Sequence, residues 1–141
     1  MKGRLLKRFE LIEHTADTGL IAYGSNLAEA FANAAYGLFS IITELNKVRE
    51  VESRPVVVSA GDVEGLLFDW INNLIYIFDV EHLLFKRFNI TVFTERNLIA
   101  TCRGESYDPS RHRLKLGVKS ATYHMLKVDR QKNRVQVIFD I

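Results

Sequence analysis

The sequence predicts an α+β domain in which a mostly antiparallel sheet carries two main helices packed on one side. Two segments repeat apolar residues at helical spacing, and the other apolar segments alternate with polar residues as strands do. The order is β-β-α-β-α-β-β-β-β, in which strands are grouped, and this favours α+β. The length of 141 residues fits one domain. We therefore expect a single domain over residues 1–141, with residues 1–8 as a flexible N-terminal extension.

A β-hairpin is expected first. The apolar runs 9–12 and 20–23 flank the polar stretch His14–Gly19. Asp17 and Gly19 suit turn positions that strand residues avoid, so the polar stretch is expected to form the turn.

Two helices follow. The first begins after Asn26, because Asn26 and Glu29 form the pattern of a capping box, and its apolar face runs for about five turns to Asn46. Small residues on this helix allow it to lie close to a sheet. Asp62 caps the second helix, whose apolar stripe is so wide that we expect it to be buried at the centre. His82 follows and is expected to close its C-terminal end.

The remaining apolar segments are expected to be strands. Pro55 places its strand at an edge or at a bulge. Residues 104–112 form a polar loop, and the chain closes with a hairpin. The strands are expected at Val51–Ser59, Phe85–Glu95, Leu98–Arg103, Val118–Val128 and Arg134–Ile141.

The composition excludes several classes of protein. No apolar run approaches the roughly 20 residues of a membrane helix. Cys102 is the only cysteine, so neither an internal disulfide nor a thiolate zinc site is expected, and Cys102 itself is expected to be a buried structural thiol. With no signal peptide recognisable, these features predict a cytoplasmic protein. The net charge of +2 is mild, and the basic residues are scattered rather than gathered for nucleic acid.

Common enzyme motifs are missing. The sequence contains no GxxxxGK[ST], GxGxxG, GxSxG or HExxH, so nucleotide binding or hydrolysis by the usual motifs has no support.

Of the four histidines, His14, His112 and His124 lie in the polar turn, the polar loop and a late strand. Lone histidines are more often structural or solvated than functional.

Acidic groups near the two ends of the chain form a candidate cation site. If the last strand lies beside the first turn, Asp17, Asp140 and the terminal carboxylate of Ile141 place three oxygen donors together. Three such anions repel one another unless a cation lies among them. From these residues by themselves, the more frequent arrangement is a turn aspartate that accepts from local amides and a solvated aspartate at the end of a strand.

Five segments together resemble the archease family, in the family's order and over residues from about Phe9 to Ile141. The segments are His14–Asp17 with Gly19, Leu27–Phe31, Gly104–Glu105, Val118–His124 and Asp140–Ile141. The resemblance implies a small cytoplasmic α+β protein that activates the RtcB-type RNA ligase, which seals spliced tRNA halves and related RNA breaks. Such a protein is chaperone-like: it speeds formation of the ligase's guanylate intermediate, permits multiple turnover and widens nucleotide use. It is not itself an enzyme.

The resemblance also implies a divalent-cation site on Asp17, Asp140 and Ile141, the last through terminal or backbone oxygen. Hard oxygen donors suit Ca²⁺, Mg²⁺ or Mn²⁺ better than zinc, and Ca²⁺ is the ion we would expect in a crystal.

Other positions match the family's motifs or depart from them. The matching positions expected to support the cation ligands or contact a partner are His14, His112, Lys119 and His124. Thr18 stands where the family commonly has an aliphatic residue, Gly117 where it usually has Glu, and Ser120-Ala121 where it usually has Ala-Ile. We assign no role to position 117.

Two other functions compete with ligase activation. The first is an independent metal-dependent hydrolase acting on RNA ends or nucleotides, with His14 or His124 as general base. The second is a plain RNA chaperone, whose affinity should fall steeply with salt. Of the three functions, the RNA chaperone has the least support, because the net charge of the chain is only +2.

Overall fold

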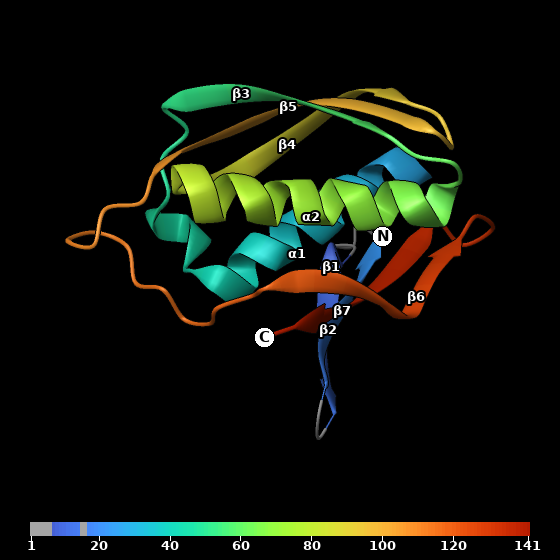
Figure 1. Cartoon of the computed structure of the whole chain (residues 1–141), viewed down its shortest axis with the longest axis horizontal. Coiled ribbons are helices and arrows are strands. Elements are labelled where there is room, and N and C mark those ends of the chain that lie inside the picture. Colours follow the sequence, from blue (N-terminus) through green and yellow to red (C-terminus); the bar gives the residue numbers. More distant parts are fainter. Residues whose placement is uncertain (1–6, 15–16) are drawn as a thin grey trace, which may run out of the picture.

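The computed structural model describes residues 7–14 and 17–141 (Figure 1). Its element order is the one that the sequence predicts, with one added 3-10 turn, η1 (Leu45–Lys47). The elements are β1 (Phe9–His14), β2 (Asp17–Tyr23), α1 (Leu27–Ile42), β3 (Glu52–Ser59), α2 (Val63–Glu81), β4 (Leu83–Phe93), β5 (Asn97–Ser106), β6 (Ser120–Asp129) and β7 (Arg134–Asp140). Of the predicted extension, residues 1–6 lie outside the described residues.

The strands form two sheets rather than one. Their orders are β1-β2-β7-β6 and β3-β5-β4, and every strand pairing is antiparallel. Figure 1 shows α1 and α2 between the two sheets, so that each sheet carries the helices on one of its faces. The predicted antiparallel pairing and helical face are thus confirmed, and the division into two sheets is new. β3 is an edge strand, as Pro55 indicated.

Helix α1 begins with the predicted capping box. The Asn26 side chain accepts a hydrogen bond from the Glu29 N–H at 2.8 Å, and the Glu29 carboxylate accepts from the Ser25 N–H at 2.6 Å. The helix ends at Ile42, before the predicted Asn46, because Thr43 is extended and forms a bridge with Leu114. A tertiary contact therefore sets the end of this helix.

Helix α1 packs closely against the β1-β2-β7-β6 sheet, because it has small residues on the face that contacts this sheet. A Cβ added to Gly37 would lie 2.8 Å from a methyl carbon of Leu20 and 3.1 Å from the ring of Phe9. No larger residue fits this position without a shift of the helix or the sheet.

Helix α2 is the buried central helix. Asp62 caps it by accepting from the Gly65 N–H at 2.7 Å, and His82 ends it in the left-handed region at φ 60°, with its N–H on the Phe78 carbonyl. Trp70 is fully buried and its indole N–H donates to the Phe31 carbonyl of α1 at 2.9 Å. This bond satisfies a polar group that burial would otherwise leave unpaired, and it joins the two helices.

The single cysteine belongs to this core. Cys102 of β5 is fully buried, and burial raises the pKa of its thiol to about 12. The prediction of a structural thiol is confirmed.

Within the described residues, no helix combines the length and hydropathy needed to cross a membrane.

Candidate functional site

The pairing of β2 with β7 brings two aspartates from opposite ends of the sequence together. Thr18 pairs with Phe139, so Asp17 and Asp140 occupy the next facing positions at the ends of the two strands. Directly opposed residues point to the same face of a sheet. Leu20 and its neighbour on β7 face the core, so the two aspartates point away from the helices, where a partner has access.

Gly19 allows the close approach of β2 and β7 beside the aspartates. A Cβ at this position would lie 2.5 Å from the Val137 carbonyl oxygen and 2.7 Å from the Ile138 side chain. Ile138 is 3% exposed, so it has little room to move. The glycine therefore belongs to the strand pairing rather than to a turn, which corrects the turn position that the sequence suggested.

Strand β6 and the residue before it add two further predicted positions to this end of the sheet. Ser120 pairs with Asp140, and the Lys119 N–H donates to the Asp140 carbonyl at 2.8 Å. The β6–β7 pairing is then interrupted between Thr122 and Lys127 by a register shift. Within this interruption, His124 Nε2 lies 4.0 Å from Asp17 Oδ2. Backbone pairing and this side-chain contact together bring four of the predicted positions to one place: Asp17, Lys119, His124 and Asp140.

The remaining predicted positions differ in their placement. The backbone of His14 pairs with Asp17 across β1 and β2, whereas its side chain lies outside the described residues. Ile141 follows β7 and is 48% exposed. A Cβ at Gly117 would meet nothing within 4 Å, so packing does not explain the glycine there.

His112 belongs to a different, buried cluster. It is 3% exposed, its Nδ1 accepts from the Asp108 N–H at 2.9 Å, and its Nε2 donates to Glu105 at 2.8 Å. Both ring nitrogens are bonded to residues of β5 or of the loop after it, so neither is available to a cation or a partner. A structural role is the one that the structure supports for this histidine.

Glu105, which the family resemblance included without a role, is the centre of that cluster. Its carboxylate accepts two hydrogen bonds from Arg111, both 2.9 Å, and one from the Arg49 N–H at 2.8 Å. The Arg111 hydrogen bonds are the main cause that lowers the pKa of Glu105 to about 2, with Arg49 and His112 adding to them against burial. Arg111 also donates to the Lys47 carbonyl, which fixes the loop to η1.

The candidate cation donors are oxygens. No group of three His, Cys, Asp or Glu side chains able to hold a metal exists within residues 7–14 and 17–141. The candidate set instead comprises the two facing carboxylates of Asp17 and Asp140 with a backbone oxygen of Ile141. This chemistry fits a hard cation, because like charges on facing positions of a strand pair are unfavourable without a positive charge between them.

Sequence relatives identify the family. The archease protein family matches residues 9–141. The chain belongs to the archease family. Archease from Sulfurisphaera tokodaii is 41% identical over 130 residues, which cover 91% of this chain and 93% of that protein. Archease from Pyrococcus abyssi is 41% identical over 128 residues, with 89% and 90% covered.

Solved structures of relatives share the fold. The solution structure of Methanobacterium thermoautotrophicum protein 1598 superposes with a TM-score of 0.80 at 33% identity, covering 96% of this chain and 100% of that one. The crystal structure of a Thermotoga maritima archease, described as a possible chaperone, superposes with a TM-score of 0.56 at 20% identity, covering 92% and 94%. At that identity the likeness shows the fold alone, and together the two confirm the α+β architecture.

Proposed function

We propose that this archease activates an RtcB-type RNA ligase of tRNA splicing and RNA repair, through a divalent cation held by Asp17, Asp140 and Ile141. Membership of the archease family supports an accessory role, and the description of one solved relative as a possible chaperone agrees with it. The observation that carries the cation site is the register of β2 and β7, which makes the two aspartates facing neighbours on an accessible surface.

The chemistry of the partner explains the use of such a site. Guanylylation of a ligase is a phosphoryl transfer, in which a bound divalent cation supplies positive charge for the phosphate oxygens. The part of this chain is to hold oxygen ligands at a fixed place. β7 presents Asp140 with its carbonyl fixed by the Lys119 N–H, and β2 presents Asp17 opposite. The His124 Nε2 lies 4.0 Å from the Asp17 carboxylate at this place.

The decisive experiment measures guanylate transfer to a purified RtcB-type ligase with and without this chain. Asp17→Asn and Asp140→Asn each remove one charge without changing side-chain size, and both should abolish stimulation and multiple turnover. Asp79→Asn is the matched control, because Asp79 is exposed on α2, away from the paired strands. Full stimulation by both site variants would reject the cation mechanism. Absence of stimulation by the wild-type chain would reject the proposed function itself.

A second measurement separates activation from independent hydrolysis. The proposed role predicts no turnover by this chain, so RNA ends and nucleotides incubated with it and Mg²⁺ or Mn²⁺ should remain intact without the ligase. Consumption of either substrate, with loss of that activity in Asp17→Asn, would favour the hydrolase instead.

A further inference from the structure

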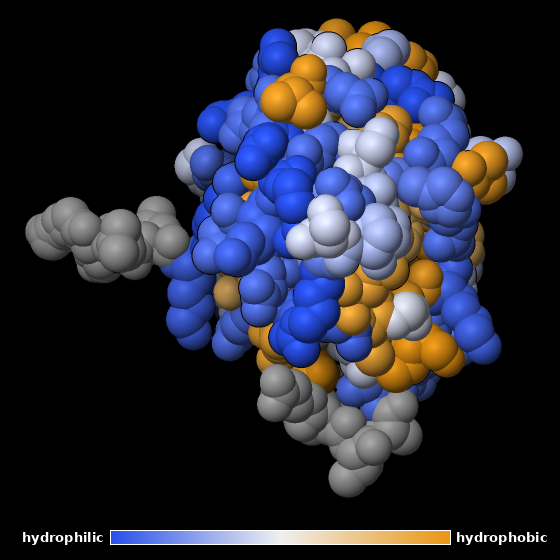
Figure 2. Space-filling model, turned by 90° about the vertical axis from the view of Figure 1, so that its left-hand side faces the viewer, coloured by the Kyte–Doolittle hydropathy of each residue, from blue (hydrophilic) through white to orange (hydrophobic). Residues whose placement is uncertain are grey.

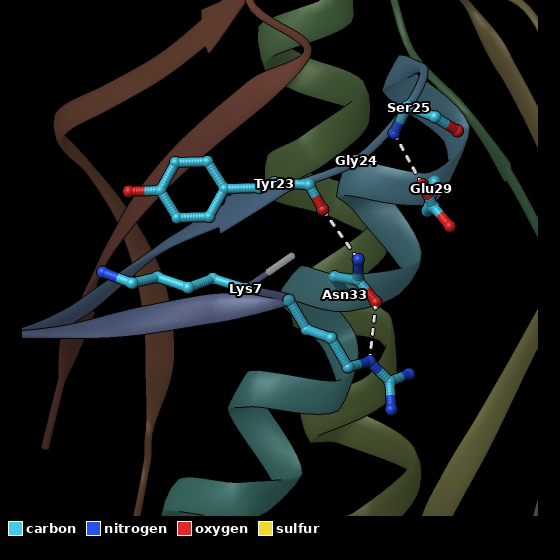
Figure 3. Close-up of a pocket in the computed structure, with 7 residues that line it drawn as sticks. Lys7, Tyr23, Gly24, Ser25, Glu29 and Asn33 are labelled. Atoms are coloured by element: carbon cyan, nitrogen blue, oxygen red, sulfur yellow. Dashed lines mark hydrogen bonds between the residues drawn. The ribbon is translucent and has the colours of Figure 1, made fainter. Parts of the chain in front are cut away.

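A cavity of about 500 Å³ opens at the opposite end of β2 from Asp17 (Figure 3). β2 has seven residues, so at about 3.3 Å per residue the cavity lies roughly 20 Å from the candidate cation site. Its lining includes Lys7, Arg8, Tyr23, Ser25, Glu29 and Asn33. Its volume is within the range of about 300–1,000 Å³ that small-molecule pockets occupy.

Arg8 is held in a fixed orientation at this cavity. Its Nε donates to the Asn33 Oδ1 at 3.0 Å, and its guanidinium carbon lies 3.6 Å from the centre of the Tyr36 ring. Asn33 is itself fixed, because it is 7% exposed and its amide nitrogen donates to the Tyr23 carbonyl at 2.7 Å. Two contacts on separate residues therefore hold the guanidinium plane before any ligand arrives.

The outer edge of that guanidinium has no partner among the described residues. Neither terminal nitrogen of Arg8 makes a hydrogen bond or ion pair with any residue in the described ranges 7–14 and 17–141. Two parallel N–H donors on one rigid plane match two oxygens of a phosphate or a carboxylate. Lys7 lines the same cavity, but Figure 3 shows its side chain directed away from that guanidinium, and its only partner within the described residues is Glu10 at 3.5 Å, an exposed contact.

The opposite wall presents an acceptor. Figure 3 shows Lys7 and the Tyr23 ring on one side of the cavity and Ser25 with Glu29 on the other. Glu29 accepts from the Ser25 N–H, and the hydrogen bonds to Ser25 lower the pKa of Glu29, with the Arg8 charge contributing further. Glu29 is therefore an anion, whose second oxygen can accept from a ligand hydroxyl.

The receptor is the arginine rather than the start of α1. At the start of that helix, the Glu29 N–H already donates to the Asn26 side chain and the Ala30 N–H to the Asn26 carbonyl. A Cβ at Gly24 would lie 2.5 Å from the Ala30 nitrogen, so the backbone packs against the first turn of α1 and leaves no room there for a ligand.

We propose that this cavity binds a phosphate-bearing small molecule of mononucleotide size. Arg8 receives the phosphate through its two terminal nitrogens, and Glu29 with Ser25 receives sugar hydroxyls. A carboxylate would satisfy the Arg8 edge but would leave much of the cavity and the Glu29 acceptor unused. The inference goes beyond the proposed function and does not depend on it, because the cavity and the cation site share no residue.

Calorimetric titration of the full chain, without ligase or divalent cation, tests the proposal. The probes are guanosine 5′-monophosphate, inorganic phosphate and guanosine. The monophosphate should bind saturably, and each fragment should bind more weakly. Arg8→Gln should weaken monophosphate binding by about tenfold or more, the loss expected for a pair of charge-assisted bonds. Arg8→Lys keeps the charge but loses the planar edge, so it should recover only part of the affinity.

Matched variants keep the result interpretable. Arg96→Gln removes the same charge from an exposed turn between β4 and β5, and it should bind as the wild type does. Asp17→Asn should also leave monophosphate binding unchanged. Circular dichroism spectra that match the wild type show that Arg8→Gln has folded. No saturable binding at millimolar monophosphate, or equal losses in Arg8→Gln and Arg96→Gln, would overturn the proposal.

Discussion

Replacing Glu105 by glutamine should make the stability of this protein much less dependent on pH in the acid range. The ordinary pKa of a glutamate is near 4.5, whereas Arg111 and the neighbouring donors lower the pKa of Glu105 to about 2. Because one pKa unit corresponds to about 1.4 kcal/mol, the folded state gains about 3 kcal/mol from the ionised carboxylate. The side chain of Glu105 is 9% exposed, so solvent screening reduces this figure only modestly.

The sign of the effect follows from the lowered pKa. The contribution is complete above the unfolded pKa near 4.5 and is lost as the pH falls towards the folded pKa near 2. Urea denaturation should therefore show Glu105→Gln to be less stable than the wild type by about 3 kcal/mol at pH 7 and by about 1 kcal/mol at pH 3.

A control and a refuting result complete this experiment. Glu81→Gln breaks the Arg54 pair, in which both side chains are more than a third exposed, so its effect should be much smaller at either pH. A difference between Glu105→Gln and the wild type that is equal at pH 7 and pH 3 would mean that lost packing, rather than the carboxylate charge, causes the destabilisation.

Three further outcomes are expected. Calcium or manganese should raise the melting temperature of the wild type, and Asp17→Asn or Asp140→Asn should remove this rise in differential scanning calorimetry. Gly19→Ala should lower the free energy of unfolding by about 1–3 kcal/mol, because the new Cβ meets the Val137 carbonyl at 2.5 Å; urea denaturation measures the loss. Asn26→Ala should cost about 1 kcal/mol through the lost cap of α1, which thermal unfolding followed by circular dichroism would detect.

Features encoded by neighbouring residues could be predicted from the sequence. The capping box at Asn26, the Asp62 cap and the helix end at His82 each depend on a few adjacent residues, and all three are confirmed. The division of the strands into two sheets could not be predicted, because alternation identifies a strand without naming its partner. The early end of α1 depends on Leu114, about 70 residues away, and has no local signal.

The candidate site divides in the same way. The approach of Asp17 to Asp140 was conditional at the level of sequence, because it required the last strand to lie beside the first hairpin, and the pairing of β2 with β7 meets that condition. His112 and Glu105 could be seen as polar residues of one loop, but their burial and mutual hydrogen bond could not. The sequence predicts that Arg8 belongs to a flexible extension. Its contact with Asn33, 25 positions away, leaves no trace in the local sequence, so it could not be predicted.

The adjacency of β2 and β7 also constrains how the chain acquires its structure during synthesis. Leu20 and Val137 are direct partners, yet 117 positions separate them (137 − 20), and both strands are interior to their sheet. A ribosome must therefore release nearly the whole polypeptide before β2 finds its second neighbour. Until then β2 exposes an unpaired backbone edge and apolar side chains, the kind of surface that chaperones recognise and that aggregates form from.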